Sequence, residues 1–205
     1  MDIRELAVPD SFVLDLVAHG DARGRFTEWY RADILTDAVG EALPLAQANH
    51  SVSAAGVLRG VHFALVPPGQ AKYVYCPVGR VLDIVVDVRR GSPAFGAVDS
   101  VELDAEKPRA VYLREGLGHA FVALEDHTSI TYLVSAGYNP GREFGVHPMD
   151  PDLALPWPAD LEFELSAKDA AAPTLAEAGA QGILPDYADC LAHYAAQRSG
   201  TGTQG

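Results

Sequence analysis

Short strand-like runs separated by turn residues are the feature that most restricts the folds open to this chain. From about residue 11 to 165, apolar and β-branched runs alternate with segments rich in Gly, Pro and Asp. No helical pattern lies between the runs, which argues against a parallel sheet with crossover helices and favours an all-β sandwich or barrel. We predict strands at residues 11–18, 25–31, 47–53, 56–63, 71–76, 80–89, 100–104, 109–113, 119–124 and 129–134.

The run at residues 80–89 has two different faces. In a strand, Val81, Asp83, Val85 and Asp87 project from one face, and the aliphatic residues between them project from the other. One face is therefore wholly apolar and the other mixed. We expect this strand to lie between a core and a wetter surface.

The C-terminal region has a different composition. Residues 174–182 and 186–197 are rich in Ala and other helix formers, which predicts one or two short C-terminal helices. Residues 199–205 are small and polar, and we expect them to be disordered. No internal repeat or interdomain linker is evident, so we expect one domain.

Charge and composition exclude several classes of function. The 205 residues carry a formal net charge of −13, and no Lys/Arg cluster forms the basic stripe that a nucleic-acid backbone requires. No apolar run approaches the roughly 18 residues that span a bilayer, and the N-terminus lacks the apolar stretch of a secretory signal. We expect a cytoplasmic protein that binds neither nucleic acid nor membrane. Two cysteines supply neither a zinc framework nor a disulfide scaffold, and we expect Cys76 to be a buried free thiol.

Polar residues inside strand-like runs are the candidates for chemistry, because burying them costs free energy unless they are paired or used. The sequence has no phosphate-binding loop, dinucleotide-binding glycine pattern, zinc-protease motif or nucleophile elbow. Gln47, Asn49 and Ser51 alternate, so a strand presents them on one face. His62 and Lys72 lie in or beside apolar strands. Taken singly, each is typical of a hydrogen-bonded structural histidine or a surface lysine.

A possible β-bulge affects two of these candidates. Arg59 and His62 are three residues apart, so a regular strand places them on opposite faces. Gly60 lies between them and permits a bulge that would turn both side chains inward. A second group of polar residues follows farther along the chain and consists of His119, Tyr132, Tyr138 and Glu143.

The motifs occur in the same order as those of a known family. Residues 56–63 (GVLRGVHF) and 67–96 (PPGQAKYVYCPVGRVLDIVVDVRRGSPAFG) closely resemble the dTDP-4-dehydrorhamnose 3,5-epimerase family. The resemblance extends over roughly residues 1–187 and includes DARGRFTEWY, QANHSVS, EGLGHAFVALED, SITYLVSAGYNPGREFGVHPMDP and SAKDAAAPTLAEA. It implies a cupin-type jelly-roll β-sandwich with short C-terminal helices, assembled as a homodimer. The expected organisation is one epimerase domain at 1–187, then a helical end and disordered tail at 188–205.

The resemblance also implies roles for individual residues. His62 matches the catalytic base, Asp169 its partner carboxylate, Tyr132 the proton donor on the opposite face, and Lys72 the residue that stabilises the enolate. The positions that match those holding the sugar nucleotide are Arg23, Glu28, Gln47, Asn49, Arg59, His119, Glu143 and Lys168, with Tyr138 as an aromatic residue beside the site.

The implied reaction needs no cofactor. In a dTDP-4-keto-6-deoxyhexose, the hydrogens on C3 and C5 are both α to the C4 carbonyl, so the ketone itself accepts the electrons. A base with a pKa near neutrality suits histidine, a cation beside the C4 oxygen suits Lys72, and a tyrosine hydroxyl can return the proton. Metal-binding relatives of this fold typically use an H-x-H pair, whereas His62 is followed by Phe63 and Ala64. We therefore expect no metal.

Three alternatives remain open at this stage. Some members of the family invert only one centre, C3 or C5, in antibiotic deoxysugar pathways, and they keep the same catalytic residues. A non-catalytic cupin that binds sugar nucleotides is a second alternative, although it has little reason to keep His62, Asp169, Tyr132 and Lys72 together. A keto-isomerase that moves the carbonyl between C3 and C4 is the third, and the long motif match argues against it.

Overall fold

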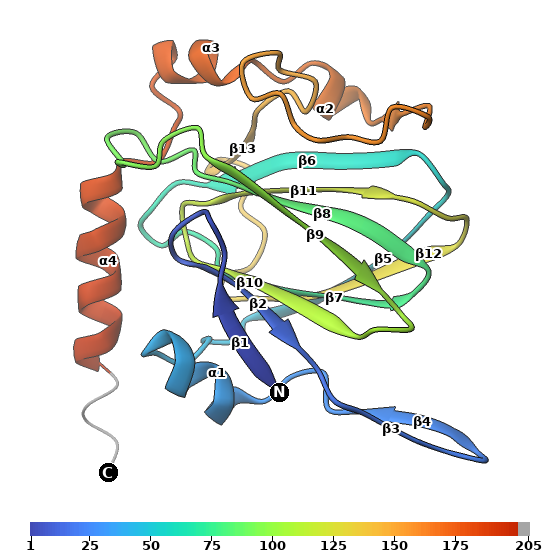
Figure 1. Cartoon of the computed structure of the whole chain (residues 1–205). Coiled ribbons are helices and arrows are strands. Elements are labelled where there is room, and N and C mark those ends of the chain that lie inside the picture. The colour runs from blue at the N-terminus through green and yellow to red at the C-terminus, as the bar shows by residue number, and fades with distance from the viewer. Residues whose placement is uncertain (201–205) are drawn as a thin grey trace.

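Two β-sheets stack face to face and confirm the expected all-β jelly-roll sandwich (Figure 1). The computed structural model describes residues 1–200. One sheet has the strand order β1-β2-β10-β7-β12-β5, and the other has the order β13-β6-β11-β8-β9 with β14 beside β6. Strands distant in sequence are neighbours in both sheets, so residues from many parts of the chain face each other across the sandwich.

The strands are short and mostly coincide with the predicted runs. The two large sheets contain β1 (Asp2–Glu5), β2 (Ser11–Asp15), β5 (Gln47–Ser53), β6 (Val57–Ala64), β7 (Lys72–Val78), β8 (Arg80–Val86), β9 (Val98–Asp104), β10 (Arg109–Leu113), β11 (Gly118–Ala123), β12 (Thr128–Val134), β13 (Glu143–Gly145) and β14 (Glu164–Leu165). A separate hairpin, β3 (Ala18–Asp21) and β4 (Gly24–Thr27), projects from the sandwich (Figure 1). The predicted strand at 25–31 is therefore wrong beyond Thr27.

Three apolar layers hold the sandwich together. The central layer lies between the sheets and includes Val74, Val85 and Val111. A second layer covers the outer face of the β6-β11-β8 sheet, where α3 (Leu175–Ala180) and its flanking loops pack. A third covers the outer face of the other sheet, against α1 (Ala32–Val39). Both sheets are thus apolar on two faces, and polar side chains that point inward must be paired or face a cavity.

The mixed face of β8 does not meet a wetter surface, which corrects the expectation for residues 80–89. Val81, Asp83 and Val85 point between the sheets, and Asp83 is 1% exposed. The aliphatic residues between them pack under the outer layer that contains α3. The mixed pattern arises because the inner face of this strand packs in the apolar core at Val81 and Val85, whereas Asp83 between them pairs with His119.

Helix α1 interrupts the strand series and was not predicted. Leu35 and Val39, four residues apart, are its buried residues, and Gly40 ends it in a left-handed conformation with φ +83°. Another unpredicted helix is the single turn α2 (Ala167–Ala170), which carries Asp169. Ser166 caps it by accepting a hydrogen bond from the Asp169 backbone N–H at 3.1 Å. This cap fixes the backbone that holds the carboxylate.

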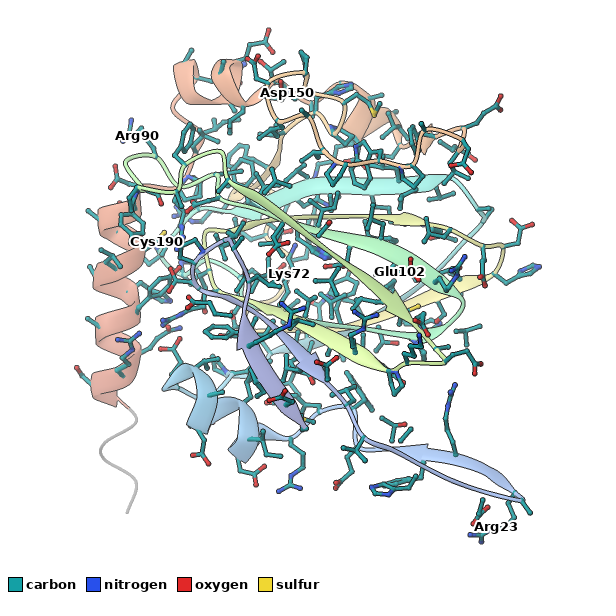
Figure 2. All side chains as sticks on the ribbon, in the orientation of Figure 1. Arg23, Lys72, Arg90, Glu102, Asp150 and Cys190 are labelled. Atoms are coloured by element: carbon teal, nitrogen blue, oxygen red, sulfur yellow. The ribbon has the colours of Figure 1, made fainter. Side chains whose placement is uncertain are left out.

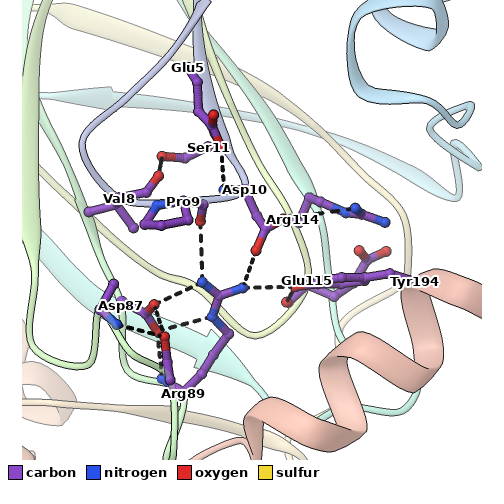
Figure 3. A network of polar contacts seen from close by, with 12 residues as sticks. Glu5, Val8, Pro9, Asp10, Ser11, Asp87, Arg89, Arg114, Glu115 and Tyr194 are labelled. Carbon is purple, nitrogen blue, oxygen red and sulfur yellow. Dashed lines mark hydrogen bonds and ion pairs between the residues drawn. The ribbon is translucent and has the colours of Figure 1, made fainter.

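The C-terminal helix α4 (Tyr187–Gly200) runs along one end of the sandwich (Figure 1). Cys190 and Tyr194 are its buried anchors. Figure 3 shows Tyr194 beside a group of buried charges that includes Arg89 and Arg114. Ser199 and Gly200 belong to this helix rather than to a disordered tail, and the rest of the predicted tail, residues 201–205, lies outside the described residues. Both cysteines, including Cys76, are buried free thiols, as expected for Cys76.

Candidate active site

A polar cavity of about 170 Å³ opens between the two sheets. Its lining comes from five strands of both sheets, β5, β6, β7, β11 and β12. Figure 2 shows Lys72 within the body of the sandwich, among side chains from both layers. The residues that line the cavity are Ser51, Arg59, His62, Lys72, His119, Phe121 and Tyr132.

The cavity exists because the inner faces of the strands change from apolar to polar along their length. On β7, Lys72, Val74 and Cys76 share the inner face, and only the first is polar. On β12, Ile130 and Tyr132 share the inner face in the same way. The apolar ends pack as the central core, and the polar ends leave the space that a ligand can enter.

A β-bulge at Gly60 brings Arg59 and His62 to the same side of β6. The β6–β11 register pairs His62 with His119 and Arg59 with Phe121, so the four residues 59–62 of β6 lie opposite the three residues 119–121 of β11. Gly60 has φ +122°, and a Cβ there would lie 2.5 Å from the Ala120 Cβ. Only glycine fits this bulge.

His62 forms a pair with Asp169. The His62 Nε2 lies 2.6 Å from the Asp169 Oδ1, and the histidine side chain is 38% exposed while the aspartate side chain is 6% exposed. Burial lowers the pKa of His62 despite the opposing hydrogen bond to Asp169. Burial acts to raise the pKa of Asp169, but the hydrogen bond and charge of His62 outweigh it, so that this pKa is lowered. At neutral pH, His62 is therefore an uncharged base beside a charged carboxylate.

Lys72 and Tyr132 are held in the forms that the expected chemistry needs. Burial lowers the pKa of Lys72 to about 8, although the charges of Glu143 and Asp83 oppose this shift. Burial raises the pKa of Tyr132. At pH 7 the lysine is mostly a cation, and the tyrosine keeps its proton for donation.

Two residues at the cavity were not predicted as functional candidates. Phe121 lines the cavity, together with Ser51, which the alternation with Gln47 and Asn49 had already indicated. Asp83 lies behind it, with its Oδ2 at 2.7 Å from the His119 Nε2. A signal for Asp83 was present, because it is a carboxylate within an apolar run.

Several predicted binding residues lie at the margin of this cavity rather than in it. Gln47 donates through its Nε2 to the Asn49 Oδ1 at 2.6 Å, on the β5 face that also carries Ser51. Tyr138 is exposed, with its backbone N–H 3.4 Å from the Gln47 Oε1. Asp169 also lines a neighbouring cavity of about 290 Å³, whose lining includes Glu143 and Lys168.

Two predicted binding residues lie away from the cavity. Figure 2 shows Arg23 at the tip of the projecting β3–β4 hairpin, where it pairs with Asp21 and its side chain is 89% exposed. Glu28, just after the hairpin, is 3.6 Å from Arg31 at the surface. This chain alone therefore does not bring these two residues to His62.

Within residues 1–200, no three His, Cys, Asp or Glu side chains are grouped so that they could hold a metal ion. Over the same residues, no helix has the length and apolar character needed to cross a membrane.

Comparisons with known proteins agree with this geometry. Residues 5–177 match the family model described as dTDP-4-dehydrorhamnose 3,5-epimerase. A dTDP-4-dehydrorhamnose 3,5-epimerase of Streptomyces griseus is 51% identical over 190 residues, covering 93% of this chain and 94% of that protein. A dTDP-4-dehydro-6-deoxyglucose 3-epimerase of Streptomyces bikiniensis is 48% identical over 193 residues, covering 94% and 98%.

Solved structures give the same result. The RmlC epimerase of Mycobacterium tuberculosis superimposes with a TM-score of 0.94 at 45% identity, covering 96% of this chain and 100% of that one. The 3'-monoepimerase ChmJ from Streptomyces bikiniensis, in complex with dTDP-quinovose, has a TM-score of 0.92 at 48% identity, covering 94% and 98%. The chain belongs to the dTDP-4-dehydrorhamnose 3,5-epimerase family.

Proposed function

We propose that this enzyme inverts C3 and C5 of a dTDP-4-keto-6-deoxyhexose by removing and returning protons next to the ketone. The observation that carries the proposal is the placement of base and acid on opposite sheets. His62 belongs to β6 in one sheet, Tyr132 belongs to β12 in the other, and both line one cavity. Inversion requires a proton to leave from one face of the carbon and return to the other.

His62 acts as the base in this mechanism. Its Nε2 is occupied by Asp169 at 2.6 Å, which leaves Nδ1 to accept the proton from carbon. Asp169 orients the ring and stabilises the imidazolium that forms. Because the pKa of His62 is lowered, the ring is ready to accept a proton at neutral pH.

Lys72 stabilises the enolate. Removal of either α-proton places negative charge on the C4 oxygen, and a preorganised cation in a water-poor cavity lowers the energy of that state. Lys72 is 8% exposed, and its ammonium group makes no hydrogen bond to any other side chain or backbone group in residues 1–200. Its hydrogen-bonding capacity is therefore available to a ligand.

Tyr132 returns the proton. Its hydroxyl faces the cavity from the sheet opposite His62 and keeps its proton at pH 7 because burial raises its pKa. The phosphates of the nucleotide need cations in a protein of net charge −13. Arg59 at the cavity and Lys168 at the adjoining cavity support that role. Gln47, Asn49, Tyr138, Glu143 and His119 complete the proposed substrate-binding set.

We infer a homodimer in which a second copy completes the binding site. Arg23 is expected to bind the sugar nucleotide, yet it is at the tip of a hairpin that projects away from its own cavity (Figure 2). Phe26 on the same hairpin is 64% exposed, the highest value among the exposed large hydrophobic side chains of residues 1–200. A partner that receives this hairpin would cover Phe26 and gain Arg23. Sedimentation should give the mass of two chains, and a monomeric protein that is active would refute the dimeric site.

The decisive experiment is incubation with dTDP-4-keto-6-deoxyglucose in D₂O, with the sugar analysed by NMR. Deuterium at C3 and C5, with inversion at both, establishes the double epimerase. The 3-epimerase of Streptomyces bikiniensis has 48% identity, so a single-centre enzyme is the second candidate. Label and inversion at one carbon alone would select it. Absence of label at both carbons would refute epimerisation of this substrate.

A further inference from the structure

A second histidine–carboxylate pair stands beside the His62–Asp169 pair. The His119 Nε2 lies 2.7 Å from the Asp83 Oδ2. His119 on β11 is the register partner of His62 on β6, so the two rings project side by side from neighbouring strands into one cavity. Asp83 approaches from β8 on the other side of β11. The active-site wall therefore contains two histidines, each held by an aspartate.

The burial of Asp83 at this position costs folding free energy. It is 1% exposed, and its Oδ1 makes no hydrogen bond with any described residue. A buried carboxylate with half of its acceptors unused destabilises a fold unless nearby positive charge compensates. The apolar neighbours of Asp83 on the inner face, Val81 and Val85, show that this strand could pack without it.

Lys72 is the active-site cation whose charge compensates that of Asp83. The groups that face Lys72 from the surrounding elements are Asp83 on β8, Glu143 on β13, Lys168 on α2, Arg59 and His62 on β6, His119 on β11 and Tyr132 on β12. Of the two carboxylates that attract the ammonium, Asp83 is fully buried and Glu143 is half-buried. Glu143 has the larger effect on the pKa of Lys72 and Asp83 the next, although water screens the charge of Asp83 less.

We propose that Asp83 is a positioning residue of the active site, which fixes the His119 ring through its Nε2 proton and provides the buried counter-charge of Lys72. With Nε2 held, Nδ1 is the nitrogen of His119 left for the sugar. The charge of Asp83 opposes the loss of the Lys72 proton that burial favours. The inference rests on the proposed function, because it assigns Asp83 to the support of the enolate-stabilising lysine.

Asp83→Asn tests the proposal, since it keeps the size of the side chain and removes its charge. We expect kcat/KM at pH 7 to fall about 10- to 100-fold, the usual cost of losing a group that orients an active-site histidine. The basic limb of the pH profile should move to lower pH, because Lys72 loses an attraction that favours its charged form. Glu102→Gln makes the same chemical change on β9, at an exposed residue paired with Arg80, and should alter neither quantity.

Two NMR measurements test the roles of Asp83 toward Lys72 and His119 in the absence of substrate turnover. The sequence has only three lysines, Lys72, Lys107 and Lys168, so the titration of Lys72 can be followed in lysine-labelled protein. Its midpoint should fall in Asp83→Asn and stay unchanged in Glu102→Gln. In histidine-labelled wild-type protein, ¹⁵N spectra should show the neutral His119 ring protonated at Nε2, with His119→Gln identifying the signal.

The outcomes separate this inference from the proposed function. A Lys72 midpoint that is unchanged in Asp83→Asn, or a His119 proton on Nδ1 in the wild type, would overturn the role of Asp83 whatever the enzyme's substrate. If Asp83→Asn does not fold, the wild-type His119 spectrum still decides the orientation claim. Failure of the wild type to exchange deuterium into the keto sugar would refute the proposed function and leave both NMR tests valid.

Discussion

Two buried cations in this molecule have opposite environments. Arg89 is fully buried at the end of the sandwich near α4, where its guanidinium donates to Asp87 at 2.8 and 3.0 Å and to Asp10 at 2.6 Å (Figure 3). Burial acts to lower the pKa of Arg89, but these hydrogen bonds outweigh it and raise the pKa. Lys72 is almost as buried and has no hydrogen-bonded acceptor among residues 1–200, and burial lowers its pKa to about 8.

The difference distinguishes a charge paired within the protein from one that the proposed mechanism assigns to the ligand. Around Arg89 the donors are matched with acceptors from three distant parts of the chain, including the Pro9 carbonyl and the Tyr194 hydroxyl. The group ties the N-terminal turn to β8 and α4. Lys72 instead faces a cavity with its hydrogen-bonding capacity unused, a state that costs stability in the free enzyme and benefits only a ligand. Variants in the two regions should therefore separate activity from stability.

The largest expected effect is the loss of catalysis in His62→Ala. Removing a general base costs on the order of 10²- to 10⁴-fold in rate, and deuterium exchange should fall at both C3 and C5 because one base serves both. The unfolding midpoint in urea should change little, since the His62 side chain is partly exposed. Exchange at the wild-type rate would show that another group removes the protons.

Arg89→Met should have the opposite effect. Loss of the guanidinium leaves Asp87 without its cation and Asp10 with only the longer contact to Arg114 at 4.0 Å, and breaking a buried ion pair in this way typically costs about 3–5 kcal/mol of unfolding free energy. The activity per folded molecule should stay at the wild-type value. Arg90→Met is the matched control, because Arg90 is exposed and forms a surface ion pair with Asp186 at 3.0 Å, so that its loss should cost less than about 1 kcal/mol. Equal costs for the two variants would contradict the structural role of Arg89.

Lys72→Met should lose activity and also the pH dependence of stability that Lys72 causes. Removing a preorganised electrostatic group costs roughly 10²- to 10³-fold in kcat. In the wild type, the pKa of Lys72 is depressed from 10.5 to about 8, so the unfolded state binds more protons than the folded state between these values and stability rises with pH across them. The methionine variant should lose that rise. Urea unfolding at pH 7 and pH 10 measures it, and a variant that keeps the wild-type rise would show that Lys72 is not the group that titrates.

The same contrast explains what could be predicted from the sequence. Alternation along β5, β7 and β12 shows which residues share a face, so the sandwich and its inward-facing polar residues follow from local pattern. The bulge at Gly60 follows from a glycine between two inward-facing residues. The pairing of Asp83 with His119 joins strands 36 residues apart, and no local pattern reports such a contact. The Arg89 group cannot be predicted from local pattern for the same reason, because its acceptors include groups of the N-terminal turn and the C-terminal helix.

The smallest effect, and the most sensitive test of the contrast, is the pH dependence of kcat/KM. Activity should rise with pH as His62 loses its proton, at a pKa below the usual 6.5, and should fall above about 8 as Lys72 loses its own. The Arg89 group stays charged throughout this range, so the protein should remain folded at pH 9 while its activity falls several-fold. Rates and circular dichroism recorded on the same samples distinguish loss of activity from loss of folded protein. If activity and folded fraction fell together above pH 8, the basic limb would report unfolding, and Lys72 would not be the titrating group.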